Sequence, residues 1–327
     1  MKLPNTCISS LGVCSKLEKN GKCHEPSPCS SVGDIAFLVQ TSKVSSEIEF
    51  NMEKNVLSEI AGQLNLGLNK TQLGLMYYSQ RTGKILGYSV REQSSIKPFF
   101  LSKIQQIPYM PYLNTPISDV IAESNATFFS VKRDENVPRV VVIFNDHASQ
   151  DSIAKIRDHA EDLKKQDINI FVVGIGDKVD SNQLMTIASS PKNIIKVKSH
   201  QFIYESMREI KDKICKVNAR VYLDKEETII TGQNEYRYYK LSFPKGTEYL
   251  DIEIDQQIGS SFVYNSFSYE NPTAENSENS YRKFNRNGIL SSILVHDIPE
   301  DSNLLYFTIH GKEKYNEVKI TVRVIDL

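Results

Sequence analysis

Polar side chains that could bind a ligand follow apolar runs that the sequence predicts to be strands. Gln40 and Ser42 come directly after one such run, and Asp146 and His147 come after another. Thr115 lies in a further loop. Because ligands of a parallel α/β sheet bind beyond the carboxyl ends of its strands, we expect these loops to form the binding site. Capping is the alternative reading, since Ser, Thr and Asp are common helix N-caps.

The sequence shows none of the usual catalytic patterns. None of its six histidines lies in an HExxH motif, and it contains no GxSxG nucleophile elbow. Gly174 and Gly176 could begin a dinucleotide-binding turn, but the third glycine is missing and Lys178 follows instead. The sequence therefore predicts a binding protein and not an enzyme.

The cysteines are concentrated at the start of the chain, in a segment with few residues that could form a core. Disulfides usually stabilise such segments. Zinc is the alternative, although no CxxC pair is present. Cysteine usage and two sequons, at Asn69 and Asn125, favour an exported glycoprotein. The four early cysteines are Cys7, Cys14, Cys23 and Cys29.

Charge and hydropathy exclude two classes of partner. The 39 Lys and Arg residues nearly balance the 40 Asp and Glu residues, and no basic stripe marks a nucleic-acid surface. No apolar run approaches the roughly 18 residues of a membrane-spanning helix, so we expect no membrane insertion. The start of the chain lacks the apolar stretch of a signal peptide, which indicates either a cytosolic protein or mature residues of an exported one. The cysteines favour the second.

Residues 34–215 alternate short apolar runs with amphipathic stretches, which is typical of an α/β fold with a doubly wound, mostly parallel sheet. Apolar residues at three-to-four spacing predict the covering helices, including one that begins near Ile48. The run 84–90 follows a turn and predicts a hairpin partner, and therefore one antiparallel edge strand. Strands are predicted at 35–39, 73–78, 140–144 and 168–173.

After Cys215 the helical spacing stops and period-two alternation begins. Turn signals divide the last 110 residues or so into six to eight strands, which predicts a C-terminal all-β sandwich. The polar stretch 270–285 is expected to be a loop. The predicted organisation is a Cys-rich segment at 1–30, an α/β domain at 31–217 and a sandwich at 218–327.

Four segments together resemble the von Willebrand factor type A domain family. The run from Asp34 to Ser45 is similar to its first strand and loop, and Asn114-Thr115-Pro116-Ile117 is similar to its second loop. The strand ending in Asn145-Asp146 and the run Phe171-Val-Val-Gly-Ile-Gly-Asp177 are similar to its later strands. The resemblance covers residues 34–215 in order and implies an adhesion domain with a Rossmann-like fold.

In that family these loops form a metal-ion-dependent adhesion site, in which hydroxyls and carboxylates hold Mg²⁺. Carried over by position, Ser42, Thr115 and Asp146 match the ligands, whereas Gln40 and Val44 replace an Asp and a Ser. Mg²⁺ requires octahedral oxygen ligation, so losing a carboxylate and a hydroxyl weakens the site. The resemblance therefore implies a degenerate site with no firm cofactor, at which only weak Mg²⁺ binding is expected.

The last segment resembles a second family, the pre-peptidase C-terminal-like β-sandwich. The resemblance lies in the stretch from Asn234 to Ile254, which includes a Pro-x-Gly-Thr turn at Pro244. Such sandwiches are appended to secreted hydrolases and surface proteins. Tyr236, Tyr238 and Tyr239 could form an aromatic platform, but strand alternation indicates that at least one face is core.

Three functions are consistent with this sequence. The first is a secreted or cell-surface adhesion protein that binds an extracellular protein or glycan through the type A domain without metal. The second is a structural matrix component that self-associates, and the third is an accessory fragment of a secreted hydrolase. We also predict a disulfide between Cys29, just before the first strand, and Cys215, because these elements meet at the bottom of the type A fold. It would leave an odd thiol among the earlier cysteines.

Overall fold

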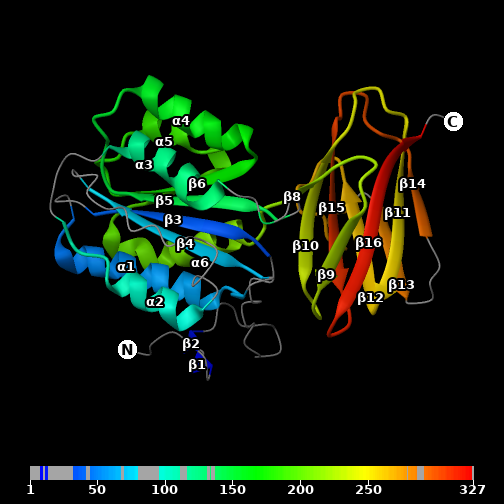
Figure 1. Cartoon of the computed structure of the whole chain (residues 1–327), viewed down its shortest axis with the longest axis horizontal. Coiled ribbons are helices and arrows are strands. Elements are labelled where there is room, and N and C mark those ends of the chain that lie inside the picture. The colour runs from blue at the N-terminus through cyan, green and yellow to red at the C-terminus, as the bar shows by residue number, and fades with distance from the viewer. Residues whose placement is uncertain are drawn as a thin grey trace, which may run out of the picture.

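A helix-covered sheet and an antiparallel sandwich form the two parts of this molecule, joined near β8 (Figure 1). The computed structural model describes residues 8–9, 12–13, 32–41, 45–67, 70–79, 96–110, 116–130, 133, 137–277, 279–285 and 291–325. A short antiparallel pair, β1 (Ile8–Ser9) and β2 (Gly12–Val13), lies at the start of the chain.

The sheet of the first part has the order β4-β3-β5-β6-β7, and every pair in it is parallel. Its strands are rich in Val, Ile, Leu and Phe, because both faces of a parallel sheet are covered by helices. The mostly parallel sheet predicted from the sequence is confirmed, while the predicted edge strand 84–90 lies outside the described residues. The strands are β3 (Asp34–Gln40), β4 (Gln72–Tyr78), β5 (Arg139–Asn145), β6 (Ile168–Ile175) and β7 (Ile194–Val197).

Two sets of helices bury the two faces of this sheet in separate apolar clusters (Figure 1). One face is covered by α1 (Glu47–Gln63), α2 (Lys97–Gln105) and α6 (Ile203–Ile214). The other is covered by α3 (Ile117–Ser124), α4 (Ile153–Lys165) and α5 (Ser181–Ile187), with a π-helical turn at Asn125–Phe129 after α3. Short 3₁₀ turns, η2 (Pro191–Asn193) and η3 (His200–Phe202), flank β7.

The strand β3 lies inside the sheet, with β4 on one side and β5 on the other. The strand order therefore reverses between β3 and β5, and the crevice at their carboxyl ends is where an open α/β sheet binds ligands. The ends of β3 and β5 meet there, where Gln40 accepts a hydrogen bond from the backbone of Asp146.

The covering helix α1 buries Val56, Ile60 and Leu64 of the predicted stripe, but not Ile48. It buries Phe50, Val56, Leu57 and Ile60 against the sheet. Ile48, which was expected on the buried face, is 71% exposed. Ile48 lies in the first turn of α1, two residues after the N-cap Ser46.

The second part is a sandwich of two sheets with the orders β13-β12-β15-β10-β8 and β14-β11-β16-β9. Inward-facing residues from both sheets form one apolar cluster. Its strands are β8 (Ala219–Val221), β9 (Glu227–Thr231), β10 (Tyr236–Ser242), β11 (Tyr249–Ile258), β12 (Ser260–Ser266), β13 (Asn279–Asn285), β14 (Ser291–Val295), β15 (Leu304–Gly311) and β16 (Asn316–Ile325).

The described residues of the sandwich form these nine strands, more than the predicted six to eight. The prediction of a loop over 270–285 was wrong for its last part, because β13 pairs there with β12. An edge strand needs a partner on one side only and tolerates a polar sequence, so alternating hydrophobicity does not reveal it.

Candidate functional site

Gln40 lies at the carboxyl end of β3 and is buried beneath the loop that follows β5. Its side-chain oxygen Oε1 accepts hydrogen bonds from Asn145 Nδ2, at 3.0 Å, and from the backbone N–H of Asp146, at 2.9 Å. A carbonyl oxygen has two lone pairs, and these two donors engage both. Gln40 therefore ties the end of β3 to the end of β5.

Asp146 and His147 form the next layer of this strand-end site. Both side chains are buried, and Asp146 Oδ1 lies 2.8 Å from His147 Nδ1. Nearby, the Thr41 hydroxyl accepts from the N–H of Met110 at 2.7 Å and donates to the carbonyl of Pro108 at 3.2 Å. These contacts hold three loops together at one edge of the sheet.

Among the described positions expected to hold Mg²⁺, Asp146 supplies a carboxylate and Gln40 a neutral amide. The ion selects several oxygen ligands in an octahedron, with carboxylates supplying the charge. Gln40 turns its oxygen toward two hydrogen-bond donors, and its remaining amide nitrogen can only donate. One oxygen of Asp146 faces His147. Within the described residues, no three His, Cys, Asp or Glu side chains are grouped so that they could hold a metal.

Of the other residues predicted to form sites, some lie outside the described residues and some are located in the structure. Ser42, Thr115, Asn69 and Cys29 lie outside the described residues. Asn125 begins the π-helical turn after α3 and is partly exposed. Cys215 forms the C-cap of α6 and is disulfide-bonded, and its partner lies outside the part of the chain that is described.

A buried ionisable pair lies behind the strand-end site. Glu53 of α1 and His200 of η3 are both buried, with Glu53 Oε2 3.6 Å from His200 Nε2. Burial raises the pKa of Glu53 to about 7, although His200 opposes the change. Burial lowers the pKa of His200, but the carboxyl of Glu53 raises it above its ordinary value. Sequence reasoning missed Glu53, because its position in a helix gives no sign that a histidine faces it.

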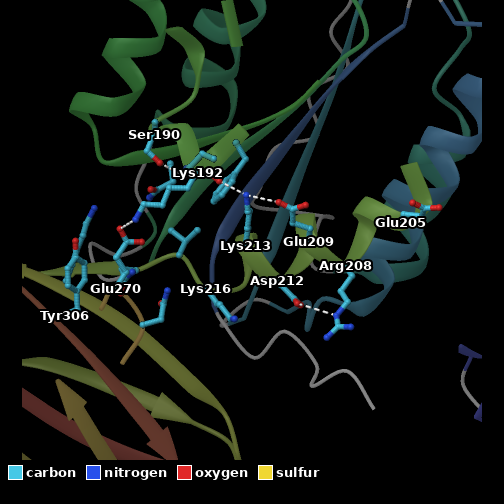
Figure 2. A pocket seen from close by; sticks show the side chains of 18 residues that line it. Ser190, Lys192, Glu205, Arg208, Glu209, Asp212, Lys213, Lys216, Glu270 and Tyr306 are labelled. Carbon is cyan, nitrogen blue, oxygen red and sulfur yellow. Dashed lines mark hydrogen bonds and ion pairs between the residues drawn. The ribbon is translucent and has the colours of Figure 1, made fainter. Parts of the chain in front are cut away.

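A pocket of about 710 Å³ lies between the two parts of the molecule (Figure 2). Its walls carry charges of both signs, mostly in pairs. Lys192 contacts Glu270 across the two parts, and the Lys213 amino group lies 2.9 Å from Glu209. Paired charges leave little net field for a charged ligand, so this pocket supports contact between the two parts better than it supports binding.

Residues 34–213 match the family model of the von Willebrand factor type A domain. The chain belongs to the von Willebrand factor type A domain family. The match ends just before the sandwich and covers the whole of the described parallel sheet. In the described residues, none of the helices has both the length and the apolar character needed to cross a membrane.

Relatives of this type A domain include chains much longer than the region that matches. It is 29% identical over 193 residues to the collagen alpha-4(VI) chain of Mus musculus, covering 58% of this chain and 8% of that one. It is 26% identical over 202 residues to matrilin-1 of Mus musculus, covering 57% and 37%. The chain thus spans less than half the length of either relative.

A solved structure supports the fold. Proximal thread matrix protein 1 from the mussel byssus superposes with a TM-score of 0.51 at 20% identity, over 57% of this chain and 46% of that one. At this identity the likeness shows a shared fold, and the chemistry of the strand ends must be read from this chain's own residues.

Proposed function

We propose that this protein is an extracellular adhesion protein that binds a protein or glycan through the strand-end surface of its type A domain, without using a metal ion. Its relatives are named as collagen and matrilin chains, which supports a place in the extracellular matrix. The proposed activity is binding, because the strand ends present a hydrogen-bonded cluster without a nucleophile and base arranged for catalysis in the described residues.

The observation that carries this proposal is the position of the Gln40 side chain. An Asp at this position would bring a second carboxylate to the strand ends, whereas Gln40 brings a neutral amide whose oxygen is held by Asn145 and Asp146. The hydrogen bonds replace the role that a cation would have in joining the loops. A ligand would then be bound by the surface of these loops through hydrogen bonds and apolar contacts.

The test is adhesion to extracellular-matrix proteins and to a glycan array, in Mg²⁺ and in EDTA. We expect binding to survive chelation, and any Mg²⁺ affinity to be no better than roughly millimolar. The double change Gln40→Asp with Val44→Ser restores a carboxylate and a hydroxyl, so calorimetry should then detect Mg²⁺ binding without stronger adhesion. Micromolar Mg²⁺ binding by the wild-type protein, or loss of adhesion in EDTA, contradicts the proposal.

A structural matrix component is the second candidate. It is favoured by the resemblance in fold to a thread matrix protein of the mussel byssus. Such a component would self-associate, so sedimentation velocity over a wide concentration range separates the two functions. A chain that stays monomeric while it binds a matrix ligand is an adhesion protein.

We further propose a boundary between the type A domain and the sandwich at residues 217 and 218, a disulfide between Cys29 and Cys215, and glycosylation at Asn69 and Asn125. The disulfide-bonded state of Cys215 supports the second of these. Peptide mapping under non-reducing conditions, with and without glycosidase, tests the covalent assignments together. Cys29 found linked to Cys14 or Cys23 contradicts the pairing.

A further inference from the structure

The sandwich has an unpaired strand edge that faces a groove. β9 pairs with β16 on one side and is the last strand of its sheet among the described residues. On its other side lies a groove of about 840 Å³, between the sandwich and the bottom of the type A domain. Four consecutive strand residues, 228–231, line it, so the groove runs along the backbone of β9 and not merely past one side chain.

The backbone of β9 offers hydrogen-bonding groups to this groove. The carbonyl of Ile230 accepts from Arg237 Nε at 3.2 Å, which shows that Ile230 directs its backbone away from β16. In an antiparallel strand the N–H and C=O of one residue point to the same side, and the residue two positions away points there too. The N–H of Ile230 and both backbone groups of Thr228 therefore face the groove, and no described backbone group pairs with them there.

The groove is positively charged. Lys70 and Arg133 line it from the type A domain, and Arg237 and Lys314 line it from the sandwich. Arg133 contacts Asp34 at 3.0 Å, and Arg237 lies 3.6 Å from Glu235. Lys70 and Lys314 form no ion pair with any described residue, so they give the groove its net positive charge.

Exposed apolar side chains line the groove beside its charged residues. Ile230 is 49% exposed on β9, and Tyr315 is 46% exposed in the turn before β16. A strand added to β9 would place alternate side chains over this apolar surface and the others toward solvent and the lysines. Five residues of β9 span about 17 Å, which matches an added strand of five or six residues.

We propose that this groove binds an extended acidic segment of a partner protein, which adds to β9 as an edge strand. Main-chain hydrogen bonds give such a complex its affinity, and the side-chain contacts give its specificity. The occupant is not a second copy of this chain, because pairing two β9 edges would bring the lysines of both copies together. This site is separate from the strand ends of the type A domain and does not depend on the function proposed for them.

The test uses the full chain and a labelled hexapeptide that alternates glutamate with valine, measured by fluorescence anisotropy at low salt. Three matched peptides accompany it: one with lysine for glutamate, one with alternate backbone nitrogens methylated, and one in which glycine and proline replace valine. We expect the first peptide to bind at least about tenfold more tightly than each of the others. In its complex the amides of Thr228 and Ile230 should become protected from hydrogen exchange.

Protein variants separate charge from strand addition. Lys314→Glu should weaken binding about tenfold, whereas Lys245→Glu, in the exposed turn between β10 and β11, should leave it unchanged. Ile230→Pro removes the N–H that faces the groove, at an edge position where proline is tolerated. Because that variant could fold poorly, the methylated peptide removes equivalent bonds from the ligand side.

Four results would overturn the proposal. If the methylated peptide or the glycine-proline peptide binds as tightly as the glutamate-valine peptide, charge alone accounts for the binding. Equal binding of the lysine peptide would remove the argument from charge. An absence of binding at millimolar peptide would exclude the site, and a dimer that Ile230→Pro dissociates would make a second copy the occupant.

Discussion

The pair formed by Glu53 and His200 is an unusual feature at the scale of single residues. A carboxyl buried in an apolar interior is stable only if it is neutral or paired, and here its partner is itself titratable. Glu53 comes from α1, and His200 comes from the turn that leads into α6. The protonation of this pair is therefore coupled to the packing of two helices on the same face of the sheet.

This pair predicts that the type A domain loses stability as the pH rises. The folded pKa of Glu53, about 7, lies above the ordinary value of 4.5, so between these values the folded state holds a proton that the unfolded state releases. The raised pKa of His200 acts in the same direction. By linkage, the contribution of these groups to the free energy of unfolding is greatest below the pKa values of the unfolded state. It is lost as the pH rises through the pKa values of the folded state.

Replacing Glu53 with Gln should flatten this dependence. The amide has almost the same shape as the carboxyl and cannot ionise. Between pH 5 and pH 8 the free energy of unfolding, measured with urea, should therefore fall less than in the wild type, and the difference should be on the order of 2 kcal/mol. Glu59→Gln, on the exposed side of the same helix, is the control and should follow the wild type. Parallel curves for Glu53→Gln and the wild type would mean that Glu53 is not protonated in the folded protein.

At the scale of elements, the start of α1 shows how local sequence fixes the loop that precedes it. The Ser46 hydroxyl accepts a hydrogen bond from the Glu49 N–H, and the Glu49 carboxylate accepts one from the Ser46 N–H at 2.8 Å, which completes a capping box. The Tyr109 hydroxyl donates to the Ser45 carbonyl at 2.7 Å. The first strand-end loop is thus held at its far end by the helix cap.

Removing this cap should destabilise the domain. Ser46→Ala leaves the N–H of Glu49 without its acceptor, and caps of this type contribute about 1 kcal/mol. Ser46→Thr keeps a hydroxyl that can accept from the Glu49 N–H and donate to its carboxylate, so it should retain stability close to that of the wild type. Thermal unfolding followed by circular dichroism measures both. If the variants with alanine and threonine at this position melt alike, the cap does not contribute to stability.

The elements also show what the sequence could predict. The strands β3 to β6 were located to within two residues at each end, because buried parallel strands are continuous apolar runs. The expectation that Gln40 and Asp146 lie at one edge of the sheet followed from their places after two strands of a parallel sheet. The two hydrogen bonds accepted by the Gln40 side-chain oxygen could not be predicted, because the sequence does not reveal the orientation of an amide side chain. β13 was missed because an edge strand needs no apolar face.

At the scale of the whole molecule, the contact between the two parts could not be predicted from sequence, because it depends on residues far apart along the chain. Lys240 of the sandwich lies 2.8 Å from Asp167, in the turn between α4 and β6. Lys192 contacts Glu270 in the same region (Figure 2). Both pairs are partly exposed, so each contributes less than about 1 kcal/mol and is weakened by salt.

These contacts predict that the two parts stabilise each other weakly. The double change Lys192→Ala with Lys240→Ala removes both ion pairs across the contact. Calorimetry at low salt should then show the unfolding of the type A domain and of the sandwich further apart in temperature than in the wild type. High salt should have the same effect on the wild type and little effect on the variant, because the charges that it screens are already gone.

The control for this experiment is Lys319→Ala, which breaks an ion pair of 2.8 Å with Glu226 inside the sandwich. It removes one lysine without touching the contact between the two parts, so it should leave the separation of the two transitions unchanged. If the double variant and the control behave alike, the apolar residues around the linker at Val217 hold the parts together and the ion pairs contribute nothing. If the double variant alone separates the transitions, the ion pairs couple the stability of the type A domain to that of the sandwich, and this coupling weakens as the ionic strength rises.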